Sequence, residues 1–95
     1  MSPEEEVARA GRAREILEAE LFKEACSEIL TSITSARINS PAKDVEFREK
    51  LWAQEVALHS ILEKLRVYLE TGELAQEQIR QASLAERAKQ FFQIN

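Results

Sequence analysis

Large apolar residues recur at alternating steps of three and four along two long segments of this chain. The first segment carries Ala19, Phe22, Cys26, Ile29, Ile33 and Ala36, and the second carries Phe47, Leu51, Leu58, Ile61, Leu65 and Tyr68, with Gln54 at one position. This spacing is typical of a coiled-coil seam, because residues at these intervals lie along one line of a helix. No stretch alternates long enough to predict a strand. The sequence therefore predicts an all-α protein.

The first helix has a marked start and a marked end. Ser2 suits a helix cap, Pro3 suits the first helical position, and the acidic residues that follow favour the positive end of the helix dipole. Residues 39–44 predict a turn, because Pro41 keeps the residue before it out of the helical region. A short link between two long helices favours an antiparallel hairpin.

Gly72 stands where the second helix is expected to end, because glycine readily adopts the left-handed conformation of a helix C-cap. We therefore expect helices over about residues 3–38 and 42–71, forming a long coiled-coil-like hairpin. The hairpin would be an oligomerisation domain of residues 1–72. Residues 73–95 would form a short C-terminal helical tail for docking.

The hairpin is expected to cover one seam on each helix and to leave other apolar residues outside. The expected hairpin core consists of Phe22, Cys26, Ile29, Ile33, Leu51, Leu58, Ile61 and Leu65. The expected contacts between copies are Leu17, Leu21, Trp52, Leu62 and Leu69, and the expected partner-docking residues are Phe91 and Phe92. Because so small a chain buries little apolar surface alone, we expect a homo-oligomer.

Charge limits the possible contacts with nucleic acid. The net charge of -4 argues against attraction over the whole surface, although a local basic face remains compatible with it. Arg9, Arg12 and Arg14 form the one basic cluster near the start of the chain. Two interpretations stay open: a solvated face balanced by neighbouring acids, or a weak DNA contact that an oligomer repeats many times.

The chain carries no motif of a catalytic or cofactor site. Glu55, His59 and Glu63 lie one helical turn apart, but this spacing is common on solvated helices and does not favour a metal site. Cys26 lies on the seam and is interpreted as a small core residue. No nucleophile elbow or phosphate-binding glycine loop occurs. We therefore predict a protein that is not an enzyme and has no metal and no cofactor.

The first thirty residues contain no apolar run suited to a signal peptide or a membrane span. The single cysteine cannot form an internal disulfide. These features favour a cytoplasmic protein without a membrane partner.

Several stretches resemble small helical proteins of tailed bacteriophages and prophage-like gene transfer agents. They are RAREILE from Arg12, LFKEA from Leu21, SPAKD from Ser40, REKLW from Arg48 and YLETGELA from Tyr68. The best fit among such proteins is the small terminase subunit, whose central part is an antiparallel helical hairpin that assembles into a ring. The resemblance implies a DNA-packaging component in the bacterial host cell. It would engage viral DNA weakly and regulate the large terminase, which carries the ATPase and the nuclease.

A second hypothesis belongs to a different class. Small terminases usually carry an amino-terminal helix-turn-helix domain, and the segment before the seam of this chain is shorter than such a domain. The alternative is a phage structural or regulatory interaction protein that forms a dimeric helical bundle, binds another phage protein or a host protein, and has no DNA role. The acidic balance of the chain agrees with this alternative.

Overall fold

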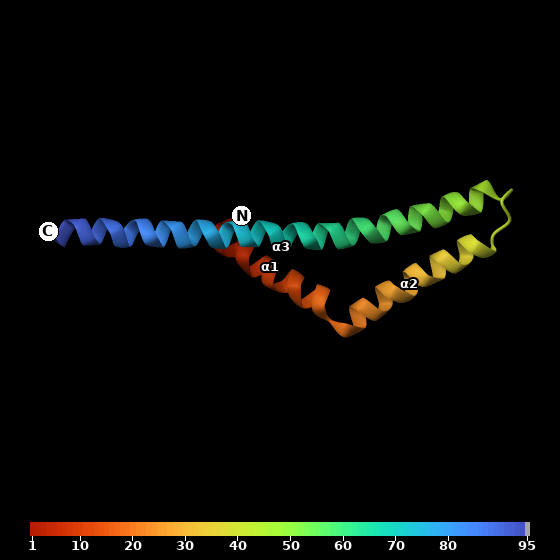
Figure 1. Cartoon of the computed structure of the whole chain (residues 1–95), viewed down its shortest axis with the longest axis horizontal. Helices are drawn as coiled ribbons and strands as arrows, with labels where there is room; N and C mark the ends of the chain where they lie inside the picture. Colours follow the sequence, from red (N-terminus) through yellow and green to blue (C-terminus); the bar gives the residue numbers. More distant parts are fainter. Residues whose placement is uncertain (95) are drawn as a thin grey trace.

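The computed structural model describes residues 1–94, and within them the chain forms three α-helices and no strand. The helices are α1 (Pro3–Glu18), α2 (Glu20–Asn39) and α3 (Val45–Ile94). Figure 1 shows α3 as a long rod, with α1 and α2 returning along it as a shallow V whose apex points away from α3. The molecule is elongated, with extents of 79 × 25 × 18 Å. The prediction of an all-α protein is confirmed.

The start of α1 is as predicted. The hydroxyl oxygen of Ser2 accepts a hydrogen bond from the backbone N–H of Glu5 at 3.1 Å, and the carboxylate of Glu5 accepts one from the N–H of Ser2 at 3.2 Å. Together these bonds form a capping box, with Pro3 at the start of the helix. They satisfy donors that a bare helix end would leave unpaired.

The single helix expected over residues 3–38 is broken at Ala19. This residue has extended backbone angles (φ -65°, ψ 124°), and its N–H donates to the carbonyl of Ile16 at 3.2 Å, which closes α1. Ala19 was expected on the seam but is exposed. The break separates α1, which packs on α3 through small side chains, from α2, which packs on α3 through larger ones, and these need different distances between helix axes.

The turn expected over residues 39–44 is present. The hydroxyl of Ser40 donates to the carbonyl of Arg37 at 2.8 Å, at the end of α2. The carboxylate of Asp44 accepts from the N–H of Phe47 at 3.1 Å, which caps α3. The second helix therefore begins at Val45, slightly later than expected.

The expected helix end at Gly72 is wrong, because α3 continues through it to Ile94. Among the described residues none, glycine included, has a positive φ, so Gly72 is not a left-handed cap. Most residues around it, among them Glu70, Glu73, Leu74 and Ala75, are strong helix formers, which offset the cost of about 1 kcal/mol that glycine imposes inside a helix. The tail expected over residues 73–95 is thus no separate helix. From Arg80 to Gln93 every side chain is exposed, and we call residues 80–94 the arm.

Small residues bring α1 close to α3. Ala10, Ala13 and Ala75 are 8%, 3% and 1% exposed. A Cβ built on Gly72 would lie 2.1 Å from the Cβ of Ala10, so the glycine serves this close approach.

Larger residues join α2 to α3 near the turn. Ile33, Leu51 and Leu58 are buried, as expected for the hairpin core. Phe22, Cys26 and Leu65, expected with them, are only half-buried. Ile29 and Ile61, also expected in the core, are 47% and 56% exposed. Figure 1 shows that α2 diverges from α3 toward the apex, so the two helices pair closely only near the turn. Of the helices described, none combines the length and the apolar character needed to cross a membrane.

Candidate functional site

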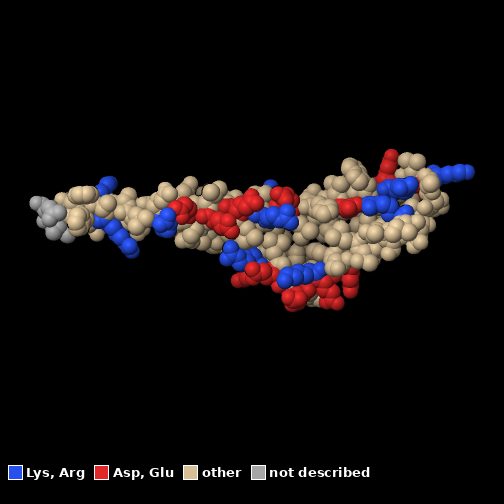
Figure 2. All heavy atoms as spheres, viewed as in Figure 1, with Lys and Arg blue, Asp and Glu red and all other residues tan. Residues whose placement is uncertain are grey.

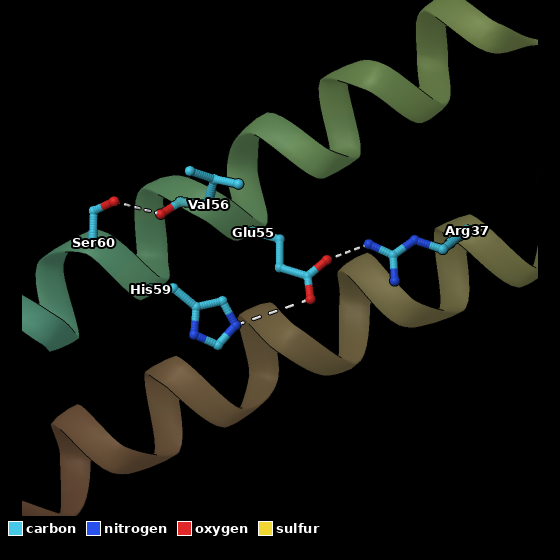
Figure 3. A network of polar contacts seen from close by, with 5 residues as sticks. All are labelled: Arg37, Glu55, Val56, His59 and Ser60. Carbon is cyan, nitrogen blue, oxygen red and sulfur yellow. Dashed lines mark hydrogen bonds and ion pairs between the residues drawn. The ribbon is translucent and has the colours of Figure 1, made fainter.

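A polar network links α2 to α3 close to the turn (Figure 3). Arg37 of α2 donates a hydrogen bond to the carboxylate of Glu55 of α3, and the two side chains also form an ion pair. The second oxygen of this carboxylate lies 3.9 Å from Nε2 of His59, one helical turn further along α3. Glu55 therefore lies between the two basic groups. Its side chain is 31% exposed, which makes the pair more shielded from water than a typical surface ion pair.

A groove lies beside this network. Its lining residues are Arg37, Arg48, Trp52, Glu55, Val56 and His59, and we call it the turn groove. Its volume is about 390 Å³, and it is a shallow groove open to solvent. Trp52, the only tryptophan of the chain, is 65% exposed. The lining contains two guanidinium groups and one carboxylate, so it carries a net positive charge in an acidic protein.

The turn groove was not predicted from the sequence. The spacing of Glu55, His59 and Glu63 did not predict a metal site, and Glu63 accepts a hydrogen bond from Arg66 at 3.1 Å. Over residues 1–94, no group of three or more His, Cys, Asp or Glu side chains is arranged to hold a metal ion. Arg37 gave no sequence signal, because its partner is on another helix.

The three arginines of the expected DNA-binding cluster do not act as one group. The guanidinium of Arg9 lies 4.1 Å from the ring centroid of Tyr68 on α3, a cation–π arrangement. Its Nε atom is buried and has no hydrogen-bond partner. Arg12 and Arg14 are exposed. Arg9 thus joins α1 to α3, and only the other two arginines face solvent.

Charges are unevenly distributed on the face drawn in Figure 2. Acidic side chains gather around the apex between α1 and α2, and basic ones gather at the end of the molecule where α2 turns into α3. The expected basic cluster on α1 therefore lies next to acidic surface. On this face, the turn end offers the denser set of basic groups.

The residues expected to contact other copies fall into two groups. Leu21 and Trp52 are 77% and 65% exposed. Leu17, Leu62 and Leu69 are half-buried, because they pack partly within the chain. Leu17 and Leu62 line an apolar groove beneath the apex, whose other apolar lining residues are Phe22, Cys26 and Leu30.

The two aromatic residues expected to dock on a partner lie on the arm. Phe91 and Phe92 are 65% and 74% exposed. Their rings meet edge to face, with centroids 5.6 Å apart and an interplanar angle of 80°. The pair forms an exposed apolar patch on the arm, where the other described side chains are also exposed.

Local hydrogen bonds shift the pKa values of three ionisable groups. The backbone N–H and the hydroxyl of Ser2 lower the pKa of Glu5 below its usual 4.5. A hydrogen bond from Arg80 lowers the pKa of Glu77 in the same direction, and the pKa of Arg80 is raised in return. These groups are fully exposed and stabilise local helix structure.

Comparison of the chain with protein-family models, with curated proteins and with solved structures finds no match.

Proposed function

We propose that this chain is a non-catalytic assembly protein of the small-terminase type, acting in DNA packaging in the cytoplasm of a bacterial host cell. Copies associate into a ring, and the ring engages viral DNA weakly and regulates the large terminase. The observation that carries the proposal is the large amount of apolar surface on so slender a molecule. Apart from Met1 and Trp52, the most exposed large apolar residues are Leu21, Ile38, Leu74, Phe91 and Phe92, each at least 65% exposed.

Physical reasons favour association over a monomeric existence. Each square ångström of apolar surface removed from water contributes roughly 25 cal/mol. The single chain buries only a few large apolar residues, among them Ile33, Leu51 and Leu58, and these form a thin core. Neighbouring copies that cover Leu21 and Ile38 would add to this core.

The arm is the proposed docking element for the large terminase. Phe91 and Phe92 lie near the end of a helix that extends past α1 (Figure 1). Rigid aromatic residues are frequent anchors of protein interfaces, because they bury much area at little cost in conformational entropy. A neighbouring chain of the ring is the other possible acceptor of this patch.

The proposed DNA contact is weak and rests on the exposed Arg12 and Arg14. Arg9 contributes little to it, because its guanidinium is held over the ring of Tyr68. A net charge of -4 further limits attraction to phosphates, so affinity would come from repetition of a small contact around a ring.

The second candidate function is a phage structural or regulatory protein that forms a dimeric helical bundle with no DNA role. The observation that favours it is the cation–π contact of Arg9 with Tyr68, which removes one of three arginines from the expected DNA cluster. Acidic side chains near the apex also disfavour DNA on that face (Figure 2).

A pull-down with the large terminase of the same phage or prophage tests the proposal. The wild-type chain is compared with the double variant Phe91→Ser/Phe92→Ser and with the matched control Leu84→Ser, also on the arm. The proposal expects capture of the large subunit by the wild type and the control, and loss of capture by the double variant. A dimer that captures no large subunit would support the second candidate instead.

A further inference from the structure

The turn groove combines an exposed aromatic face with positive charge. Trp52 presents its indole at one side, and Arg48 is an exposed cation of the same helix, one turn earlier. Arg37 and His59 also line the groove, and Arg37 shares its charge with Glu55. This set of groups occurs at the turn end of the molecule, where Figure 2 shows basic side chains together.

These groups suit a ligand that carries both a planar ring and a phosphate. Bases stack on exposed aromatic side chains, and each such contact contributes roughly 1 to 3 kcal/mol. Guanidinium groups bind phosphate oxygens with paired donors, which a single ammonium group cannot match. Within a duplex the bases are stacked on one another, so only an unpaired nucleotide can use the face of Trp52.

We propose that the turn groove binds an unpaired nucleotide of a DNA strand, with the base on Trp52 and the phosphate on Arg48. Glu55 weakens this binding, because its carboxylate lies in the groove and neutralises Arg37. The inference deepens the DNA part of the proposed function and rests on it only for the choice of DNA as the nucleic acid.

Binding can be read directly from the protein, because Trp52 is its only tryptophan. A short oligothymidylate is titrated into the full chain at two salt concentrations while tryptophan fluorescence is recorded. Stacking of a base on the indole is expected to quench the fluorescence, and higher salt is expected to weaken the apparent affinity. Inorganic phosphate at the same concentration is expected to leave the fluorescence unchanged.

Two variants with opposite expected effects separate a binding role from a structural one. Arg48→Gln is expected to weaken oligothymidylate binding about tenfold, which corresponds to roughly 1.4 kcal/mol. Glu55→Gln removes a negative charge from the groove and frees Arg37, so binding is expected to tighten severalfold even though the hairpin loses an ion pair. General loss of structure would weaken binding in both variants.

Arg80→Gln is the matched control, because Arg80 is an exposed arginine of the same helix whose carboxylate partner, Glu77, lies outside the turn groove. It is expected to bind the oligonucleotide as the wild type does.

The proposal is overturned if Arg48→Gln and Arg80→Gln behave alike, if Glu55→Gln weakens binding, or if inorganic phosphate quenches Trp52 equally. If the wild-type protein forms a ring but does not bind the oligonucleotide, this inference alone is contradicted. If the protein is monomeric but binds the oligonucleotide, the assembly proposal alone is contradicted.

Discussion

Gly72 of α3 and Ala10 of α1 approach so closely that a Cβ on residue 72 would lie 2.1 Å from the Cβ of Ala10. No pair of non-bonded carbon atoms tolerates that distance, so a side chain at this position forces α1 away from α3. The same Cβ would also lie 3.1 Å from the carbonyl oxygen of Glu6, which is backbone and cannot move alone.

Gly72→Ala is therefore expected to lower the free energy of unfolding by about 1 to 3 kcal/mol, the usual cost of overpacking, despite the better helix propensity of alanine. Gly11→Ala is the control, since a Cβ there meets nothing within 4 Å. The control is expected to stabilise the protein by up to about 1 kcal/mol. Urea unfolding followed by circular dichroism measures both, and equal effects of the two variants would contradict the close packing of α1.

Reversal of charge is expected to have different effects at the three arginines of α1. Arg9→Glu should lower the free energy of unfolding by about 1 kcal/mol or more, because a carboxylate replaces the cation over the ring of Tyr68. Arg12→Glu and Arg14→Glu should leave stability nearly unchanged, because both side chains are exposed.

In a DNA-binding assay, the double variant Arg12→Glu/Arg14→Glu should abolish any salt-sensitive binding that arises from α1. Filter binding at two salt concentrations measures this effect. Unchanged binding would show that these two arginines do not contact DNA. The turn groove would then be the remaining candidate for the DNA contact.

Leu58 and Ile61 test how far the core of the single chain extends. Leu58→Ala is expected to cost about 2 to 4 kcal/mol of unfolding free energy, because Leu58 is only 9% exposed. Ile61→Ala should cost much less in a dilute, dissociated sample, because Ile61 is 56% exposed. At high concentration, Ile61→Ala should weaken association if neighbouring copies cover this residue. Unfolding curves at two protein concentrations show the difference, and equal losses for both variants when dilute would place Ile61 in the core.

Acid is expected to fray the start of α1. The pKa of Glu5 is lowered by its bonds with Ser2, so the contribution of the ionised carboxylate to stability is present above pH 4.5 and is lost as the pH falls through the lowered value. Titration of the Glu5 carboxylate by NMR should give a midpoint below 4.5. Ser2→Ala should move that midpoint upward toward 4.5. A wild-type midpoint at or above 4.5 would show that the capping box does not persist in solution.

Local chemistry made part of this fold predictable. Ser2 with Pro3 fixed the start of α1, and Pro41 marked the turn, because both signals act through neighbouring backbone atoms. Gly72 misled the prediction, since glycine serves both helix ends and close helix contacts, and only the position of Ala10 decides between them. The break at Ala19 carries no glycine or proline signal and depends on how α1 and α2 pack on α3.

The candidate site was less predictable than the fold. Arg37 and Glu55 meet only because α2 and α3 pair in one particular register, and a hairpin sequence with several charges near its turn allows many such pairs. Trp52 was recognised as an outward residue, and its 65% exposure agrees with that placement. Its association with Arg48 and His59 in one groove required the three-dimensional structure.

Self-association is the central claim, and the mass of the purified protein in solution tests it most directly. Light scattering coupled to size exclusion, at two salt concentrations, gives this mass relative to the 10.9 kDa of one chain. The account predicts an assembly of roughly eight to twelve chains that persists at high salt, because apolar contacts rather than ion pairs hold a closed ring together. A dimer would favour the bundle without a DNA role, and a mass of one chain at every concentration would contradict the account.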